Sequence, residues 1–192
     1  MTGAPPTIVK LGGSLVSDAA RLGRLLGALA DGGEGRCVIV PGGGPFAEAV
    51  RQAQGQLGFS DALAHRLALD AMGRMAEVLS ESEPRLAIVR SVMEARSAEA
   101  PVIWDPVALK DGHPSIPESW DVTSDSLALW LATELEAPRC ILVKSIDRPA
   151  GASLADLARM GVVDAACPRF AASYAGEIVI RGPAADIVRA AA

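Results

Sequence analysis

The sequence predicts an α/β protein built on a mostly parallel β-sheet with helices on both faces. Short runs of β-branched and aliphatic residues alternate along the chain with segments of helical periodicity. The strand-like runs are apolar throughout, which is typical of parallel strands that are buried on both faces. No repeat or long linker divides the chain, so we expect residues 1–192 to form a single domain with a sizeable core.

The N-terminal half begins with two strand–helix units. Residues 7–11 predict a strand, and residues 18–30 predict a helix because leucines recur there at helical spacing. Residues 37–40, Cys-Val-Ile-Val, predict a second strand, which a proline and three glycines end. Pro45 is typical of the first turn of the helix that follows, and residues 60–82 predict another helical stretch.

The middle of the chain continues the alternation. Residues 86–89 and 102–104 predict strands, whereas residues 105–123 are rich in Pro, Gly and Ser and predict a loop. Residues 124–137 predict an amphipathic helix, and residues 140–143 predict a buried strand.

The end of the chain is expected to add one more strand. Ser153 begins a capping-box-like sequence that predicts a short helix. Residues 177–181 predict the strand, and Pro183 is expected to open a last helix. This β-α alternation is what predicts a parallel sheet.

Composition and charge exclude several classes of function. The net charge is −5 and no basic run occurs, so nucleic-acid binding is not expected, and an anionic ligand must be held by a few local donors. No apolar stretch approaches the length of a membrane-spanning helix, and the N-terminus lacks a signal-peptide pattern, so we expect the cytoplasm. The cysteines are odd in number and widely spaced, which predicts neither a disulfide nor a zinc site: Cys37, Cys140 and Cys167.

Two glycine-rich turns follow the first two predicted strands. They read Lys10-Leu11-Gly12-Gly13-Ser14 and Pro41-Gly42-Gly43-Gly44-Pro45. Parallel sheets bind ligands at the carboxyl ends of their strands, where such turns lie. Glycine allows the backbone to approach a ligand closely, and a row of backbone N–H groups at a helix N-terminus binds phosphate. The alternative interpretation of each turn alone is a tight connection between a strand and a helix.

Lysine is rare in this chain, with three lysines against 15 arginines. Lys10 and Lys144 both fall at predicted strand ends, whereas Lys110 does not. A compact point charge retained at the ligand-binding edge of the sheet indicates phosphate binding. The alternative is a solvated lysine at the end of a strand.

A polar segment, Asp121-Val-Thr123-Ser-Asp125, precedes the predicted helix at 124–137. Asp125 falls in the first turn of that helix, where the macrodipole stabilises a carboxylate by about 0.3–1 kcal/mol. The functional interpretation is that Asp125 orients lysines around a phosphoryl group in transfer. Both interpretations fit the sequence.

A rival motif overlaps the second glycine turn. Gly42-x-Gly44-x-x-Ala47 matches the dinucleotide-binding fingerprint, which indicates a nicotinamide- or flavin-binding oxidoreductase. That fingerprint also requires an acidic residue at the end of the next strand. Asp61 lies at the right distance, but it falls at the start of a helical stretch. A non-catalytic nucleotide- or anion-binding protein on the same fold is a third interpretation.

His65 lies in the predicted helical stretch near Asp61. A lone histidine in a helix is most often a structural or surface residue. The functional alternative is that His65 and Asp61 recognise a polar or ammonium-bearing phosphoryl acceptor.

Taken in order, these motifs resemble the amino acid kinase family. The motifs are Lys10-x-Gly-Gly-Ser14, Gly42-Gly43-Gly44 after a strand, Thr123-Ser-Asp125-x-Leu-Ala and Lys144-Ser-Ile-Asp147. The resemblance covers almost the full chain. It implies a three-layer αβα sandwich, an acceptor site in the N-terminal half and a nucleotide site in the C-terminal half. It also implies ATP as phosphoryl donor, with Mg²⁺ bridging the ATP oxygens and no dedicated protein ligands for the metal.

The resemblance also implies a role for each motif residue. Lys10 would neutralise charge on the transferring phosphoryl group, Asp125 would position the lysines, and Lys144 would contact the nucleotide phosphates. The residues expected to bind the nucleotide phosphates are Gly12, Gly13, Ser14, Lys144 and Asp147. The residues expected to bind the acceptor are Gly42, Gly43, Gly44, Asp61, His65, Asp121 and Thr123. Arg148-Pro149 stands where the family has glycine after the aspartate, and no lysine follows in the sequence.

Within that family, three segments resemble the subgroup that phosphorylates an aminomethylfuran methyl phosphate in methanofuran and methylofuran biosynthesis. They are residues 64–68, 120–125 and 161–164. The implied reaction adds a second phosphate to the furan methyl phosphate. The family resemblance further implies a homodimer or higher homo-oligomer, for which the apolar residues of 60–80 are the candidate surface, although they could equally form core.

Overall fold

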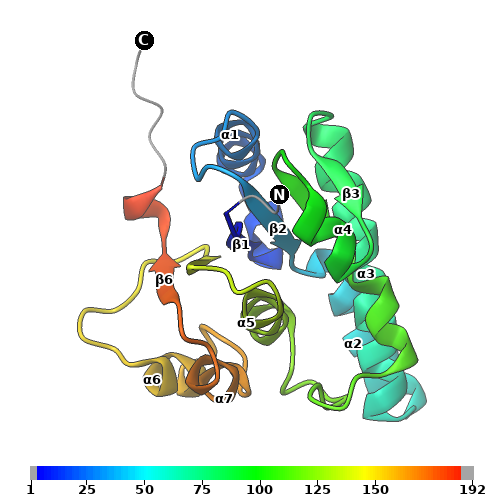
Figure 1. Ribbon diagram of the computed structural model, residues 1–192. Coiled ribbons are helices and arrows are strands. Elements are labelled where there is room, and N and C mark those ends of the chain that lie inside the picture. Colours follow the sequence, from blue (N-terminus) through cyan, green and yellow to red (C-terminus); the bar gives the residue numbers. More distant parts are fainter. Residues whose placement is uncertain (1–3, 187–192) are drawn as a thin grey trace.

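The computed structural model describes residues 4–186 (Figure 1). Its centre is a six-stranded sheet in the order β3-β4-β2-β1-β5-β6, and every neighbouring pair of strands is parallel. The strands are β1 Thr7–Leu11, β2 Cys37–Pro41, β3 Ala87–Val89, β4 Val102–Trp104, β5 Arg139–Val143 and β6 Glu177–Arg181. The parallel sheet predicted from the sequence is therefore confirmed.

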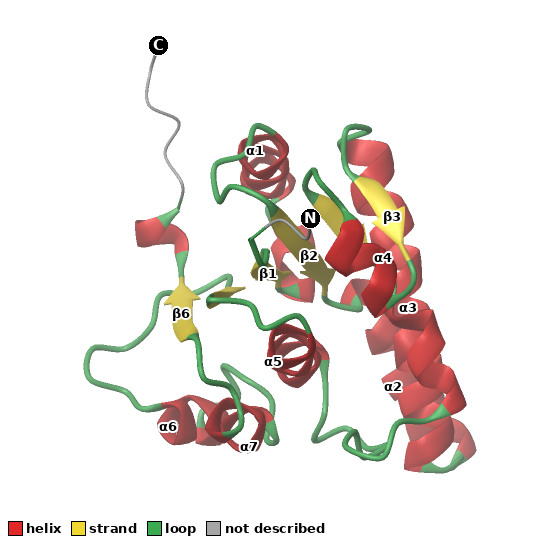
Figure 2. Cartoon of the chain, viewed as in Figure 1, coloured by secondary structure: helices red, strands yellow, loops and turns green. Residues whose placement is uncertain are grey.

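Helices follow the strands as the alternation predicts (Figure 2). The α-helices are α1 Ala19–Ala30, α2 Gly44–Leu57, α3 Asp61–Ser82, α4 Val92–Ser97, α5 Ser124–Glu134, α6 Leu154–Arg159 and α7 Cys167–Ala172. The 3-10 helices are η1 Gly13–Ser17, η2 Pro106–Asp111 and η3 Pro183–Ala185.

The sheet is the middle of three layers. On one face, alternate strand residues such as Val9 and Ile39 pack against the leucines of α1 and the C-terminal half of α3. On the other face, Ile8 and Leu142 pack with α5, α7 and the N-terminal half of α3. Figure 1 shows α1 and α5 on opposite sides of the strands. The two apolar layers follow from the period-2 alternation of strands that are buried on both faces.

Helix α5 corrects one expectation from the sequence. The segment was expected to be amphipathic, but residues 124–132 are all buried in the structure. The helix is covered on every side because it packs against the sheet on one side and against α7 on the other. A helix that is apolar around its whole circumference is typical of a buried position.

Several short elements lie where the sequence predicted none. Residues 105–123 contain η2, because Pro106 opens that turn and Asp105 accepts a hydrogen bond from the Val107 backbone N–H. Helix α4 begins with a capping box formed by Ser91 and Glu94. At Pro183, by contrast, the sequence predicted a helix, and the structure has only the 3-10 turn η3, which ends at Ala185 and is followed by an extended Asp186.

Strand β1 lies at the centre of the sheet, between β2 and β5. The chain leaves β1 toward β2 and later returns on the other side of β1 as β5, so the strand order reverses at this place. Crevices at such a reversal, at the carboxyl ends of the strands, are where open parallel sheets bind ligands. Hydrogen bonds tie the three strand ends together here: Gly12 N–H to Val143 O at 3.1 Å and Gly42 N–H to Leu11 O at 2.8 Å.

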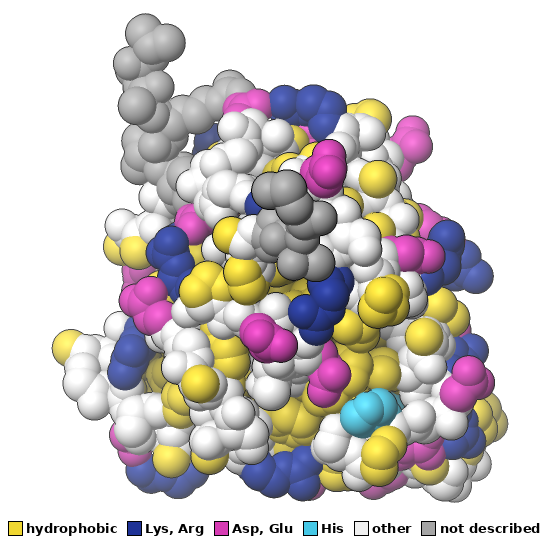
Figure 3. Space-filling view, viewed as in Figure 1, with side chains coloured by type: hydrophobic (Ala, Val, Ile, Leu, Met, Phe, Trp, Pro, Cys, Tyr) yellow, Lys and Arg dark blue, Asp and Glu magenta, His cyan; other side chains and the backbone are white. Residues whose placement is uncertain are grey.

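The surface carries both signs of charge. Figure 3 shows Lys and Arg side chains interspersed with Asp and Glu over the face in view, with hydrophobic atoms between them. Among residues 4–186, no helix combines the length and hydrophobicity needed to cross a membrane. Cys37, Cys140 and Cys167 are all free and buried in the structure.

Candidate active site

A buried cluster of three charged residues lies where the central strands end. Asp125 Oδ1 is 2.9 Å from Lys10 Nζ and 2.7 Å from Lys144 Nζ, and Lys144 Nζ is also 2.7 Å from Asp125 Oδ2. All three residues are nearly inaccessible to solvent, at 5%, 4% and 7% exposure for Lys10, Asp125 and Lys144. Strand β1, helix α5 and the end of β5 each contribute one member.

The strand register explains how the lysines reach the same carboxylate. Lys10 pairs with Leu142 across the β1–β5 ladder, and Lys144 follows directly after β5. Side chains alternate between faces along a strand, so Lys10 points to the same face as Ile8, which is the face that α5 covers. Asp125, in the first turn of α5, stands opposite both ammonium groups.

The electrostatics of the cluster follow from burial and mutual attraction. Burial by itself would raise the pKa of Asp125, but the charges of Lys10 and Lys144 and their hydrogen bonds hold that pKa below its ordinary value. Burial is also the main cause that lowers the pKa of Lys144 to about 8, and the neighbouring Lys10 charge lowers it further, against the attraction of Asp125. The cluster carries one more positive than negative charge, which suits an anionic ligand.

Arg21 of α1 holds the backbone behind Lys144. Its Nη1 donates a buried hydrogen bond of 2.8 Å to the carbonyl oxygen of Lys144. The same guanidinium binds Asp186 in a bidentate manner, with contacts of 2.6 and 2.8 Å. This bond fixes the turn after β5 and therefore the position from which the Lys144 side chain extends.

A small cavity of about 150 Å³ lies over the two lysines. It is lined by Lys10, Gly12, Gly13, Ser14, Lys144, Ser145, Ile146, Gly161 and Val162. Ser14 Oγ donates to Ser145 Oγ at 3.0 Å, so the first glycine turn is linked to the turn after β5. Two ammonium groups beside glycine backbone form a donor set that fits the phosphates of a nucleotide.

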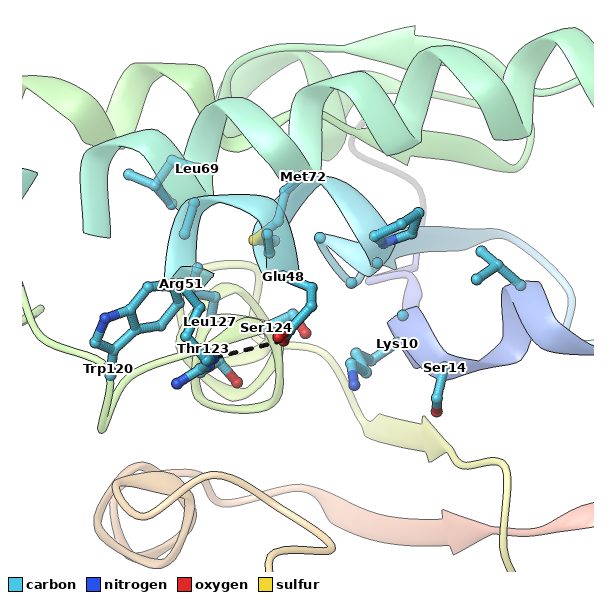
Figure 4. Close-up of a pocket in the computed structure, with 18 of the residues that line it drawn as sticks. Lys10, Ser14, Glu48, Arg51, Leu69, Met72, Trp120, Thr123, Ser124 and Leu127 are labelled. Carbon is cyan, nitrogen blue, oxygen red and sulfur yellow. Dashed lines mark ion pairs between the residues drawn. The ribbon is translucent and has the colours of Figure 1, made fainter. Parts of the chain in front are cut away.

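A larger cavity of about 500 Å³ lies on the other side of Lys10, between α2, α3 and the start of α5 (Figure 4). Its polar part includes Lys10, Ser14, the second glycine turn, Glu48, Arg51 and Thr123. Its apolar part includes Leu69, Met72, Trp120, Val122 and Leu127. Lys10, Gly13 and Ser14 line both cavities and form the wall that they share.

His65 lines the large cavity and is 4% exposed. Burial lowers the pKa of His65, although a hydrogen bond to the Ser119 carbonyl acts in the opposite direction. Nδ1 lies 3.2 Å from that carbonyl oxygen, which can only accept, so Nδ1 carries the proton. In the neutral ring, Nε2 is then a hydrogen-bond acceptor.

Trp120 closes the far end of the large cavity. The guanidinium carbon of Arg51 lies 4.0 Å from the centre of the indole ring, a cation–π contact. Trp120 Nε1 donates to Gln54 Oε1 at 2.5 Å. Two residues of α2 therefore fix the indole, which offers an apolar face to a ligand.

Three acidic residues named in the sequence analysis lie apart from the cluster. Asp61 is exposed at the start of α3, where its carboxylate accepts from Gln54 Nε2 at 2.7 Å. Asp121 lines a separate cavity of about 220 Å³. Asp147 accepts from the Ala184 N–H at 2.9 Å and so ties the turn after β5 to η3. None of the three lines the large cavity or the small cavity, so their positions do not support the expected binding roles.

Asp164 has a structural role in the site that the sequence alone does not reveal. Its carboxylate accepts from the backbone N–H groups of Thr123 and Ser126 at 2.9 and 3.0 Å, and from both hydroxyl groups. Its own N–H donates to Asp125 Oδ2 at 3.3 Å. Asp164 therefore caps α5 from a distant loop and holds the carboxylate that the lysines share. In the sequence, this segment stood out only because residues 161–164 resemble the corresponding segment of one kinase subgroup.

The dinucleotide-binding alternative gains no support from the fold. Strand β2 leads into α2 and then into α3, so Asp61 begins a helix rather than ending a strand. Among the described residues, no group of three or more His, Cys, Asp and Glu side chains is arranged to hold a metal ion.

Fold and site together define an α/β protein with two buried lysines beside glycine-rich turns at the carboxyl ends of its central strands. The amino acid kinase family model matches residues 5–96. A curated relative, the [5-(aminomethyl)furan-3-yl]methyl phosphate kinase of Methanocaldococcus jannaschii, is 32% identical over 146 residues. That match covers 73% of this chain, and the chain spans 66% of the relative's length.

Solved structures of uridylate kinases share the fold over nearly the whole chain. The enzyme from Archaeoglobus fulgidus has a TM-score of 0.68 and 18% identity, and the match covers 92% of this chain and 90% of that one. UMP kinase from Ureaplasma parvum has a TM-score of 0.68 and 15% identity, with coverage of 95% and 91%. The chain belongs to the amino acid kinase family.

Proposed function

We propose that the protein is an ATP-dependent kinase that transfers the γ-phosphoryl group to a small acceptor bearing a phosphate. The observation that carries this proposal is the Lys10–Asp125–Lys144 cluster, which lies beside a small and a large cavity. The nucleotide phosphates would occupy the small cavity, and the acceptor would occupy the large one. Lys10 lines both, so it lies where the phosphoryl group has to pass.

The chemistry requires charge neutralisation and alignment rather than a general base. An oxygen of the acceptor phosphate is already ionised and attacks the γ-phosphorus of ATP. A P–O bond forms to that oxygen, the bond from the γ-phosphorus to the β,γ-bridging oxygen breaks, and ADP leaves. Lys10 and Lys144 would offset charge on the phosphoryl oxygens, while Asp125 keeps the two ammonium groups in place. Bound Mg²⁺ would neutralise further charge on the ATP oxygens.

For the acceptor we propose an aromatic monophosphate of the class named in the curated relative, a [5-(aminomethyl)furan-3-yl]methyl phosphate. The product would carry a diphosphate in place of the monophosphate. The lining of the large cavity supports this class of acceptor. It has an indole and aliphatic side chains for a ring and places glycine backbone and Lys10 together for a phosphate.

The test is Lys10→Ala, assayed for ADP release with ATP, Mg²⁺ and the aminomethylfuran methyl phosphate. Loss of one preorganised charge in a water-poor site typically costs about 10²–10³-fold in kcat. Lys110→Ala is the matched control, because Lys110 pairs with Asp70 in a half-exposed ion pair and lines neither cavity. The control is expected to retain wild-type turnover.

Two results would contradict the proposal. Normal turnover in Lys10→Ala would remove the charge cluster from the mechanism. ATP binding without turnover of any small phosphate would instead favour the non-catalytic nucleotide binder.

We further propose that the protein acts in the cytoplasm and forms a homodimer or a higher homo-oligomer. Only some apolar residues of 60–80, such as Leu63 and Val78, are exposed for an interface, since most of the others are in the core.

A further inference from the structure

The large cavity contains one acidic side chain among the described residues that line it. Glu48 of α2 lies in the same cavity as Lys10 and Arg51. In Figure 4, the Glu48 side chain lies between Lys10 on one side and the Arg51–Trp120 pair on the other. A carboxylate in this position faces the space that the acceptor would fill.

This carboxylate opposes a purely anionic acceptor. Like charges separated by a few ångströms in a partly desolvated cavity repel each other, and the repulsion grows as water is expelled. Glu48 is therefore unfavourable beside a monophosphate alone. It becomes favourable when the same molecule also carries a positive group that reaches the carboxylate.

Glu48 has only weak partners in the protein. Its Oε2 is 3.8 Å from Arg51 Nε, at the limit of an ion pair, and its Oε1 is 3.4 Å from Gln52 Nε2. The Arg51 guanidinium lies over Trp120 instead. The Glu48 side chain is 58% exposed, so a ligand can reach it without first breaking a strong contact.

The geometry of α2 sets the distance between the places that would bind the two ends of the ligand. Gly44, in the second glycine turn, and Glu48 are four residues apart on α2 and so share one face of the helix. Their separation along the axis is about 6 Å, or roughly one turn. An aromatic ring with a one-carbon arm on each side can span that interval, with its phosphate at the glycine turn. The Leu69, Met72 and Leu127 side chains border the space between the two ends.

We propose that Glu48 binds the ammonium group of the acceptor, and that the protein selects aromatic monophosphates that carry a primary amine. His65, whose Nε2 is a hydrogen-bond acceptor in the same cavity, can assist. This proposal rests on the kinase function proposed above. It adds that Glu48 recognises the ammonium group of the acceptor. It also replaces Asp61, which lies outside the cavity, as the acidic partner of the amine.

The experiment compares two acceptors with wild-type protein and Glu48→Gln. One acceptor is the aminomethylfuran methyl phosphate, and the other has a methyl group in place of the aminomethyl group. Glu48→Gln is expected to lower kcat/KM for the amine about tenfold to a hundredfold, the effect of removing a charged hydrogen-bond partner. It is expected to leave unchanged or raise kcat/KM for the methyl analogue, because the repulsion of the phosphate is also removed.

Glu77→Gln is the matched control. Glu77 forms an i,i+3 pair with Arg74 on α3, as Glu48 does with Arg51 on α2, but it lines neither cavity. The control should keep wild-type kinetics with both acceptors. Glu48→Asp, which retains the carboxylate, should recover part of the preference for the amine.

The outcomes separate this inference from the proposed function. If wild-type protein phosphorylates neither acceptor, the proposed function fails. If it phosphorylates both with equal kcat/KM, or if Glu48→Gln lowers both equally, the kinase function stands and the ammonium-binding role of Glu48 is overturned.

Discussion

Gly13 and Gly42 face each other with their backbones in direct contact. A Cβ atom added to Gly42 would overlap the Gly13 nitrogen and would lie 2.9 Å from the Gly13 Cα. A Cβ on Gly13 would likewise lie 2.5 Å from the nitrogen of Gly44. The two glycine turns therefore need glycine for packing against each other, in addition to any contact with phosphate. Gly13 lies in the wall between the two cavities, so this packing also sets their shape.

Gly42→Ala is expected to destabilise the protein and to reduce its activity. Backbone atoms cannot move aside as a flexible side chain can, so the added methyl group must push the two turns apart. Overpacking of this kind typically costs about 1–3 kcal/mol in the free energy of unfolding. Chemical denaturation measures the stability, and ADP release in the kinase assay reports the displaced site.

Gly55→Ala in α2 is the control for this substitution. The space around a Cβ at Gly55 is open, and the residue is inside a helix, where alanine is favoured over glycine by about 0.5–1 kcal/mol. We expect the variant to be at least as stable as the wild type. Equal stability of Gly42→Ala and Gly55→Ala would contradict the packing argument.

The pH dependence of catalysis should reflect Lys144. Burial lowers the pKa of its ammonium group to about 8, and the charge of Lys10 adds to the effect. Below that pH the group is charged and can bind phosphate, whereas above it the group loses its proton. The value of kcat/KM for ATP, which reports free enzyme, is therefore expected to fall as pH rises past about 8.

Lys144→Arg distinguishes the titration of Lys144 from other causes of a decline in kcat/KM at high pH. Arginine stays protonated throughout the accessible range, so the decline above pH 8 should disappear even if the larger guanidinium lowers the overall rate. An unchanged basic limb in this variant would assign the titration to a different group.

The lowered pKa of Lys144 affects stability in the opposite direction from its effect on catalysis. Between about pH 8 and the ordinary lysine value of 10.5, the unfolded chain binds a proton at residue 144 that the folded chain has released. Stability rises with pH wherever the unfolded state binds more protons. The contribution of Lys144 to the free energy of unfolding therefore increases with pH across this window, while its contribution to nucleotide binding decreases.

Asp164→Asn tests the cap that holds Asp125. The amide has one oxygen fewer and no charge, so it cannot accept all the hydrogen bonds from Thr123 and Ser126. Loss of a helix cap costs about 0.5–2 kcal/mol of stability. Because the Asp164 backbone N–H also donates to Asp125 Oδ2, displacement of this segment should lower kcat in protein that circular dichroism shows to be folded.

Asp156→Asn is the matched control for the cap. Asp156 and Ser153 form a capping box at the start of α6, and neither residue lines the two cavities. This variant should lose a comparable amount of stability and keep its kcat. If the two variants lose activity in equal proportion to stability, Asp164 has no specific role in the site.

The sequence was sufficient to predict the sheet and the residues at its edge. Strands such as 7–11 and 37–40 are unbroken apolar runs ended by glycines, and these patterns are local. Once the strands are taken as parallel, Lys10 and Lys144 must emerge at the same edge. The meeting of both lysines with Asp125 follows from that topology together with the position of Asp125 in the first turn of α5.

Other parts of the site have no local pattern. Glu48 on α2 has the same sequence context as a solvated helix residue, and only the tertiary fold places it in a cavity. Asp164 acts on Thr123 from 41 positions along the chain. Asp61 has a suitable position in the sequence, but its carboxylate bonds to Gln54 at the α2–α3 corner. The short helices α4 and α7 are too brief for periodicity to reveal them.

The wall that Lys10, Gly13 and Ser14 form between the two cavities has a consequence for inhibitor design. A single molecule that joined the acceptor to adenosine through a chain of phosphates would occupy both cavities at once. Its second half would bind at high effective concentration after the first half had docked. Such a bisubstrate compound should bind far more tightly than either half alone. Its linker should be short, because only one layer of residues separates the two cavities.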